Sequence, residues 1–127
     1  GYGLSCGGIS ASLRDMARFG LMLLNNGQTE GRQVIPAAWC QDIRHGAHGL
    51  YDPDNYKMWP NGAYRNQFWV EDSQLGRHYC FGVFGQMVMV APDTGMMVVK
   101  LSSWPDFVDS SYFRLTMAGL KAVEAAL

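Results

Sequence analysis

The sequence is poor in charge and in cysteine, and it contains none of the short motifs that mark most catalytic centres. Charged residues make up 17% of the 127 residues, and the net charge is −1. That balance provides neither a basic surface for nucleic acid nor an acidic tail. No apolar run approaches the roughly 20 residues that a membrane-spanning helix needs. We therefore expect no nucleic-acid partner and no membrane span.

The three cysteines, Cys6, Cys40 and Cys80, are odd in number and lie far apart. They form no Cys-x-x-Cys pair, so neither a disulfide framework nor a zinc motif is predicted. Buried free thiols are the favoured interpretation, and Cys80 is favoured as a core thiol over a nucleophile. Free thiols favour the cytoplasm over the periplasm or secretion. The chain begins without Met, so the localisation itself stays undecided.

No metal site and no cofactor are predicted. His45, His48 and His78 lack the spacing of metal ligands, and surface histidines are the favoured interpretation. A phosphate-binding glycine loop is absent. Ser-x-x-Lys and Gly-x-Ser-x-Gly are absent as well, so the sequence holds no complete nucleophile motif.

What the sequence does contain is the pattern of one α+β domain. Ser12 and Asp15 have the form of a capping box, and apolar residues then recur every three or four positions, which predicts a helix over 13–26. Gly27 is suited to end that helix in the left-handed conformation. Pro36 fits the first turn of a second helix over 36–45.

The second half of the chain is rich in β-branched and aromatic residues. These predict strands over about 63–70, 77–90 and 96–102, followed by a helix over about 110–126. The expected fold is an antiparallel sheet covered by helices. Three strands alone would leave the edges of the sheet unpaired.

Two glycines stand out in the strand region, at Gly82 and Gly85. Glycine weakens a strand, so a pair of them suggests that another group approaches the backbone closely. The stretch from Cys80 to Gln86 is therefore the first candidate for the wall of a binding site.

Four stretches resemble known enzymes. Residues 7–20 (GGISASLRDMARFG) resemble a segment of the serine β-lactamase-like superfamily, which includes class C β-lactamases, penicillin-binding proteins and related esterases. Residues 64–70 (YRNQFWV), 84–86 (FGQ) and 99–106 (VKLSSWPD) resemble, more specifically, the 6-aminohexanoate-dimer hydrolases, amidases that degrade nylon oligomers. The resemblance implies that residues 1–127 are a single C-terminal segment of a β-lactamase/transpeptidase-like fold. It also implies a missing N-terminal part that carries the nucleophile motif.

The resemblance places part of an active site on this chain. The Lys-Thr-Gly triplet of β-lactamases falls on Cys80, Phe81 and Gly82, which are thereby implied to contact substrate. The backbone N–H of Val83 is implied to form half of the oxyanion hole, with the other half at the missing serine. The absence of the triplet's lysine argues against efficient β-lactam hydrolysis.

Three aromatic residues complete the implied substrate site. Phe84 and Phe113 stand where the nylon-oligomer hydrolases carry histidine, which implies a less polar pocket and a shift from amides toward esters. Trp69 matches a tryptophan of the substrate cleft, and a plain core aromatic is an equal alternative for it.

The function that follows is part of a serine hydrolase, an amidase or esterase that acts by forming an acyl-enzyme on a small-molecule amide or ester. The alternative is a non-catalytic domain that binds a peptide or a partner chain through an exposed sheet edge.

Overall fold

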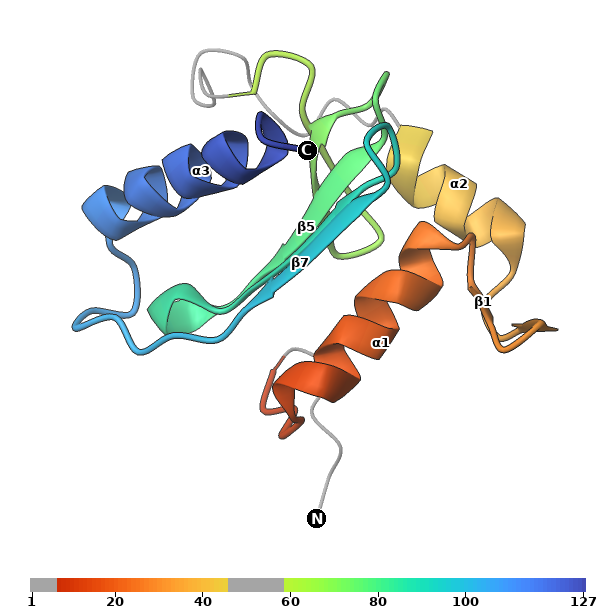
Figure 1. Cartoon of the computed structure of the whole chain (residues 1–127), viewed down its shortest axis with the longest axis horizontal. Helices are drawn as coiled ribbons and strands as arrows, with labels where there is room; N and C mark the ends of the chain where they lie inside the picture. Colours follow the sequence, from red (N-terminus) through yellow and green to blue (C-terminus); the bar gives the residue numbers. More distant parts are fainter. Residues whose placement is uncertain (1–6, 46–58) are drawn as a thin grey trace.

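The computed structural model describes residues 7–45 and 59–127 and shows an antiparallel sheet with helices on both faces (Figure 1). The elements are α1 (Leu13–Leu24), β1 (Gln28–Thr29), β2 (Arg32–Gln33), α2 (Ala37–His45), β3 (Ala63–Arg65), β4 (Phe68–Asp72), β5 (Arg77–Phe81), the 3-10 turn η1 (Val83–Gly85), β6 (Met87–Ala91), β7 (Met96–Lys100) and α3 (Ser110–Glu124). The predicted α+β class is confirmed.

Helix α1 begins and ends at the residues that carry its capping signals. The Ser12 hydroxyl accepts the N–H of Asp15 at 3.2 Å and donates to the Asp15 carboxylate at 2.6 Å. The helix ends at Leu24 because Asn26 and Gly27 both adopt positive φ, at 54° and 80°. It is therefore two residues shorter than the predicted span of 13–26.

The single strand predicted over 63–70 is instead a hairpin of β3 and β4. Asn66 and Gln67 adopt φ of 49° and 68°, which reverses the chain in a two-residue turn. Arg65 consequently pairs with Phe68 across the hairpin. Neither turn residue is glycine, which is why the sequence pattern concealed the reversal.

The strand predicted over 77–90 is likewise two strands, β5 and β6, separated by η1. Phe84 and Gly85 both take positive φ there, at 57° and 81°, so the extended chain cannot continue. The last strand ends at Lys100 rather than at residue 102.

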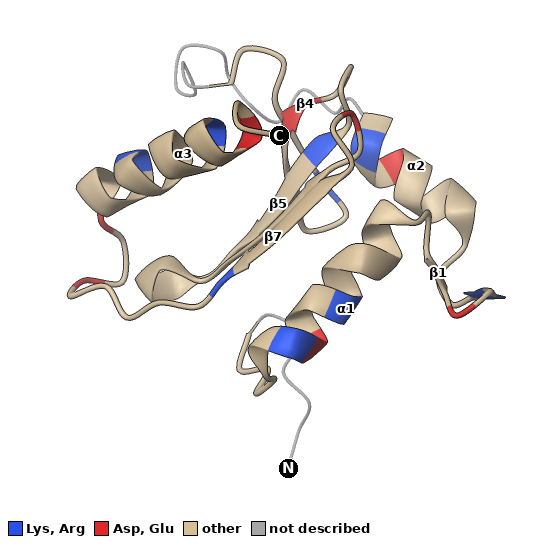
Figure 2. Ribbon diagram, viewed as in Figure 1, with Lys and Arg blue, Asp and Glu red and all other residues tan. Residues whose placement is uncertain are grey.

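The sheet has the order β3-β4-β5-β6-β7, with every neighbouring pair antiparallel. The expectation of three strands in this chain was therefore wrong, since both long predicted strands divide. Strands β3 and β7 form the two edges. In β5, β6 and β7 the only charged residues, Arg77 and Lys100, stand at strand ends, and Figure 2 shows the centre of this part of the sheet without charge.

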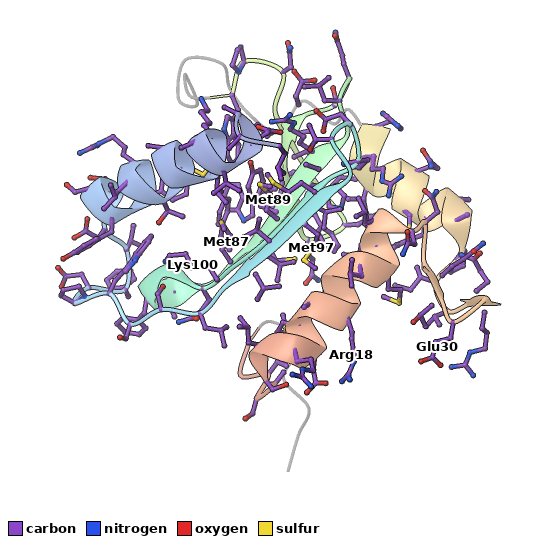
Figure 3. The ribbon with its side chains drawn as sticks, in the orientation of Figure 1. Arg18, Glu30, Met87, Met89, Met97 and Lys100 are labelled. Carbon is purple, nitrogen blue, oxygen red and sulfur yellow. The ribbon has the colours of Figure 1, made fainter. Side chains whose placement is uncertain are left out.

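Two apolar clusters fasten the helices to the sheet. On the face toward α3, Met87 and Met89 pack with Tyr79 and Met117, whereas Met97 on β7 packs toward α1 (Figure 3). The second cluster joins the other face to α1 and α2, and its buried members are Leu23, Cys40, Ile43, Phe68, Val88 and Val90. Alternate residues of each strand thus enter different layers.

None of the helices within residues 7–45 and 59–127 is long and apolar enough to cross a membrane.

Candidate functional site

The turn between β5 and β6 presents an exposed backbone donor, the Val83 N–H, just beyond the end of β5. Val83 is 56% exposed, and no residue in the described part of the chain accepts its N–H. Gly82 before it is extended, with φ of −118° and ψ of 162°. A Cβ on Gly82 would meet only the Gln86 side chain, at 3.0 Å and beyond. Gly82 is itself exposed, so a ligand can approach the backbone just beyond the end of β5.

Backbone hydrogen bonds to Gln86, Trp104 and Phe107 hold this turn in place. The Gly82 N–H donates to Gln86 O at 3.0 Å, and the Phe84 N–H donates to Phe107 O at 3.0 Å. The Trp104 N–H donates to Phe84 O at 3.2 Å. Backbone groups on either side of Val83 are thus fixed before any ligand binds.

Three side chains complete the network: Lys100 at the end of β7, Ser102 just after β7, and Gln86 directly after η1. Lys100 Nζ donates to Gly85 O at 3.0 Å and to Ser102 Oγ at 2.7 Å, and Figure 3 shows Lys100 at the end of β7 beside η1. The Gln86 amide donates to Ser102 O at 2.5 Å and accepts the Ser102 N–H at 3.1 Å. Sequence reasoning missed Gln86, Lys100 and Ser102 as site residues, although all three lie within the stretches that carry the family resemblance.

Lys100 and Ser102 form a serine–lysine pair, but their bonds identify it as structural. The Ser102 hydroxyl lies 2.7 Å from Gly85 O, so its proton is directed to a carbonyl rather than to the amine. Burial lowers the pKa of Lys100, and its ammonium lies 4.6 Å from the centre of the Trp104 ring. The pair therefore braces η1.

Gly85 needs to be glycine at this point. Its φ is +81°, and a Cβ there would lie 2.2 Å from a ring carbon of Trp104. The close approach predicted from the two glycines thus comes, at Gly85, from a side chain of the protein itself.

An apolar cavity of about 450 Å³ opens beside the turn, between the sheet and α3. We call it the aromatic chamber. It contains four of the predicted site residues, Trp69, Phe81, Gly82 and Phe113, and Phe81 and Phe113 meet edge to face at 5.4 Å between ring centres. The rest of its lining is Trp59, Gly85, Gln86, Met87, Trp104, Phe107, Val108, Asp109, Ser110 and Thr116.

Cys80 is separated from this group, because neighbouring residues of a strand face opposite sides of a sheet. It packs in the cluster toward α1 and lines a second cavity, of about 700 Å³, with Phe19, Trp39 and Phe68 among its walls. Burial raises the pKa of its thiol to about 11, so the thiolate is scarce at neutral pH. Four of the described residues border both cavities: Phe81, Gly82, Gln86 and Met87.

Phe84 borders neither cavity, and its side chain is 43% exposed. It takes part in the site through its backbone, which carries the positive φ of the turn and bonds to Phe107 and Trp104. The side-chain role implied by the resemblance stays a prediction.

Buried titratable groups elsewhere in the described residues are bonded in ways that suit structure. Tyr79 donates its hydroxyl to Glu71 at 2.5 Å, and burial raises its pKa far above the usual value. The His78 ring bonds to Gly76 O at 2.8 Å, and burial lowers its pKa to about 4. No group of three or more metal-ligating side chains lies within the part of the chain that the structure describes.

The chain is similar to known hydrolases over most of its length. A 6-aminohexanoate-dimer hydrolase of Paenarthrobacter ureafaciens is 34% identical over 108 residues, which cover 84% of this chain and 28% of that protein. A solved structure from Bacillus anthracis, provisionally assigned as a 6-aminohexanoate-dimer hydrolase, matches with a TM-score of 0.65 and 28% identity. That match covers 88% of this chain and 28% of the other. No protein-family model matches the chain.

The chain therefore spans slightly more than a quarter of the length of each relative. The predicted resemblance to hydrolases of this kind is confirmed, and with it the α+β fold of a β-lactamase-like hydrolase segment.

Proposed function

Since this chain is similar, over most of its length, to a segment of the 6-aminohexanoate-dimer hydrolases, we propose that it forms one wall of a serine hydrolase active site. The substrate is a small molecule with an amide or ester bond. The nucleophilic serine belongs to a part of the protein outside these residues. The role of this segment is to bind the substrate and to stabilise the oxyanion.

In this proposal the reaction is acyl transfer. The serine oxygen adds to the substrate carbonyl, and its proton passes to a base that lies with it outside this chain. The carbonyl oxygen becomes an oxyanion and accepts the Val83 N–H. The tetrahedral intermediate then collapses, the amine or alcohol leaves with a proton, and water releases the acid from the acyl-enzyme.

The observation that carries the proposal is the Val83 amide. It is an exposed donor without a partner among the described residues, set in a turn whose neighbouring backbone groups are fixed. A donor that is already oriented needs no reorganisation when negative charge develops. Removal of one such donor typically costs about 2.7–4 kcal/mol of transition-state stabilisation.

One further observation favours a second, non-catalytic function. Strand β7 pairs only with β6 among the described residues, so its other edge can accept a strand from a peptide or from another part of the protein. A chain that only binds in this way would need no oriented donor at Val83. We therefore place the binding function second to the catalytic one.

The test uses the protein that contains this chain together with the isolated 127 residues. An alkyl fluorophosphonate should label the larger protein at one serine, located by peptide mass spectrometry, and should abolish its turnover of p-nitrophenyl acetate. The isolated chain should neither label nor turn over the ester. Labelling of Ser102, or turnover by the isolated chain, would overturn the proposal that the nucleophile lies elsewhere.

A further inference from the structure

The aromatic chamber has the size and lining of a ligand pocket. Its volume of about 450 Å³ falls within the range of small-molecule sites, about 300–1,000 Å³. Six aromatic rings line it: Trp59, Trp69, Phe81, Trp104, Phe107 and Phe113. Within this lining the Phe81 ring centre lies 6.0 Å from that of Trp59 and 6.3 Å from that of Trp69.

Three polar side chains of the chamber, those of Gln86, Asp109 and Thr116, are already engaged with the protein. Asp109 caps α3 by accepting the N–H groups of Ser111 and Tyr112 at 2.8 and 3.0 Å. Thr116 donates its hydroxyl to Tyr112 O at 2.8 Å, and the Gln86 amide is held by the backbone of Ser102. These three side chains therefore offer a ligand little hydrogen bonding, and the mainly aromatic lining favours binding through apolar contact.

The charge of the described lining disfavours an anionic ligand. Among the described residues, no lysine, arginine or histidine lines the chamber, and the acidic Asp109 is the one ionisable side chain there. An anionic group buried among these rings would lose its hydration without gaining a counter-ion. The capping bonds of Asp109 commit that carboxylate to the helix.

The chamber lies directly beside the proposed oxyanion donor. Gly82 and Gly85, which flank the Val83–Phe84 pair, both line it. Gly82 also borders the second cavity, whereas Gly85 borders only the chamber, so the chamber adjoins the turn on both sides of Val83 and can receive a substituent of a carbonyl held there.

We propose that the aromatic chamber is the specificity pocket of the site, and that it receives an uncharged aliphatic or aromatic substituent of the substrate. That the bound group belongs to a substrate rests on the proposed function. That the chamber binds such a group does not. It predicts that the protein selects esters or amides whose substituent on this side is a hydrocarbon chain or ring without a terminal charge.

The test measures binding by isothermal titration calorimetry in the protein that contains this chain. The probes are 2-heptanone, hexanoate and hexylammonium, which are similar in length and differ in charge. The ketone has no leaving group, so binding can be followed without turnover. We expect 2-heptanone to bind at least about tenfold more tightly than hexanoate, because a buried charge without a partner is costly. Equal binding of these two, or tighter binding of hexylammonium than of the ketone, would overturn the proposal.

Variants on one helix provide the matched comparison. Phe113→Ala removes a ring from the chamber, whereas Leu115→Ala removes a side chain that is 68% exposed and lies outside it. We expect the first to weaken 2-heptanone binding by about tenfold and the second to leave it unchanged. Equal effects of the two substitutions would count against the chamber.

A gain of binding guards against variants that merely unfold. Val108 lines the chamber and is 70% exposed, so lysine fits there with its ammonium at the rim. Val108→Lys should tighten hexanoate binding several-fold while 2-heptanone binding changes little. If hexanoate binding does not tighten, the ligands do not bind in the chamber and the proposal is overturned. If the ketone binds but no ester is hydrolysed, the chamber stands and the proposed function fails. If esters are hydrolysed but the ketone does not bind, the proposed function stands and the chamber is not the specificity pocket.

Discussion

Replacing Val83 by proline tests the oxyanion donor with the smallest possible change to the turn. Proline removes one N–H, and that N–H has no acceptor among the described residues. Gly82 already has the extended φ and ψ that a residue before proline prefers, and Val83 is the first residue of η1, where proline is well tolerated. The ring also has room, since Val83 is more exposed than buried.

The expected loss follows from that geometry. The bonds that hold the turn come from Gly82, Phe84 and Trp104, so they survive in Val83→Pro. Only the bond to the developing oxyanion is lost, which should lower kcat by about 10²–10³-fold, or about 2.7–4 kcal/mol. The control Val83→Ala keeps the N–H and removes only exposed methyl groups, so its kcat should stay within a few-fold of the parent.

The assay is steady-state hydrolysis of p-nitrophenyl hexanoate by the protein that contains this chain, with kcat and KM determined separately. Loss of a donor that acts on the transition state should appear mainly in kcat. Urea unfolding of each variant checks that the fold is intact. If the proline and alanine variants have the same kcat while both are folded, Val83 is not an oxyanion donor.

Three further predictions concern stability, each measured by urea unfolding. Gly85→Ala should lower the free energy of unfolding by about 3 kcal/mol or more, because it adds a clash with Trp104 to the strain of positive φ. The control Gly31→Ala, with positive φ but open space around it, should cost about 1–2 kcal/mol. Equal costs would mean that the Trp104 ring moves freely aside. His78 is buried in its neutral form with its pKa lowered to about 4, so the unfolded chain binds the proton more readily. The free energy of unfolding should therefore be constant above about pH 6.5 and fall by about 3 kcal/mol as the pH drops to 4. A His78→Gln variant should lose this pH dependence. Arg44→Met should cost about 3 kcal/mol, since the buried guanidinium donates to the last carbonyls of α1, and a cost under about 1 kcal/mol would show that water replaces those bonds.

Local signals predicted the helices better than the strands. The helix predicted over 13–26 has its caps in adjacent residues, Ser12 and Gly27, so the sequence places both ends to within two residues. The strand predicted over 63–70 contains a reversal at Asn66 and Gln67, two residues that do not demand positive φ as glycine does. What holds them there is the pairing of β3 with β4, which links residues that the pattern alone joined into one strand.

The candidate site divides in the same way. Gly82 and Gly85 mark the turn in the sequence, since glycine in a strand pattern signals a bend or a close approach. The bonds from Lys100 and Ser102 to Gly85 cross from another strand, and no local pattern predicts them. The sequence also could not show that Phe113, on α3, reaches Phe81 across the chamber.

By itself the sequence determined the α+β class, the positions of the helices and the glycine-marked turn, because each depends on residues within one or two turns of chain. Only the tertiary structure decided which predicted site residues meet. Cys80 and Phe81 are neighbours in sequence, yet the alternation of a strand sends one toward α1 and the other into the aromatic chamber. The backbone of Val83 became a candidate donor only when residues far along the chain fixed the turn around it, since a rigid donor requires long-range bonds that no short stretch can supply.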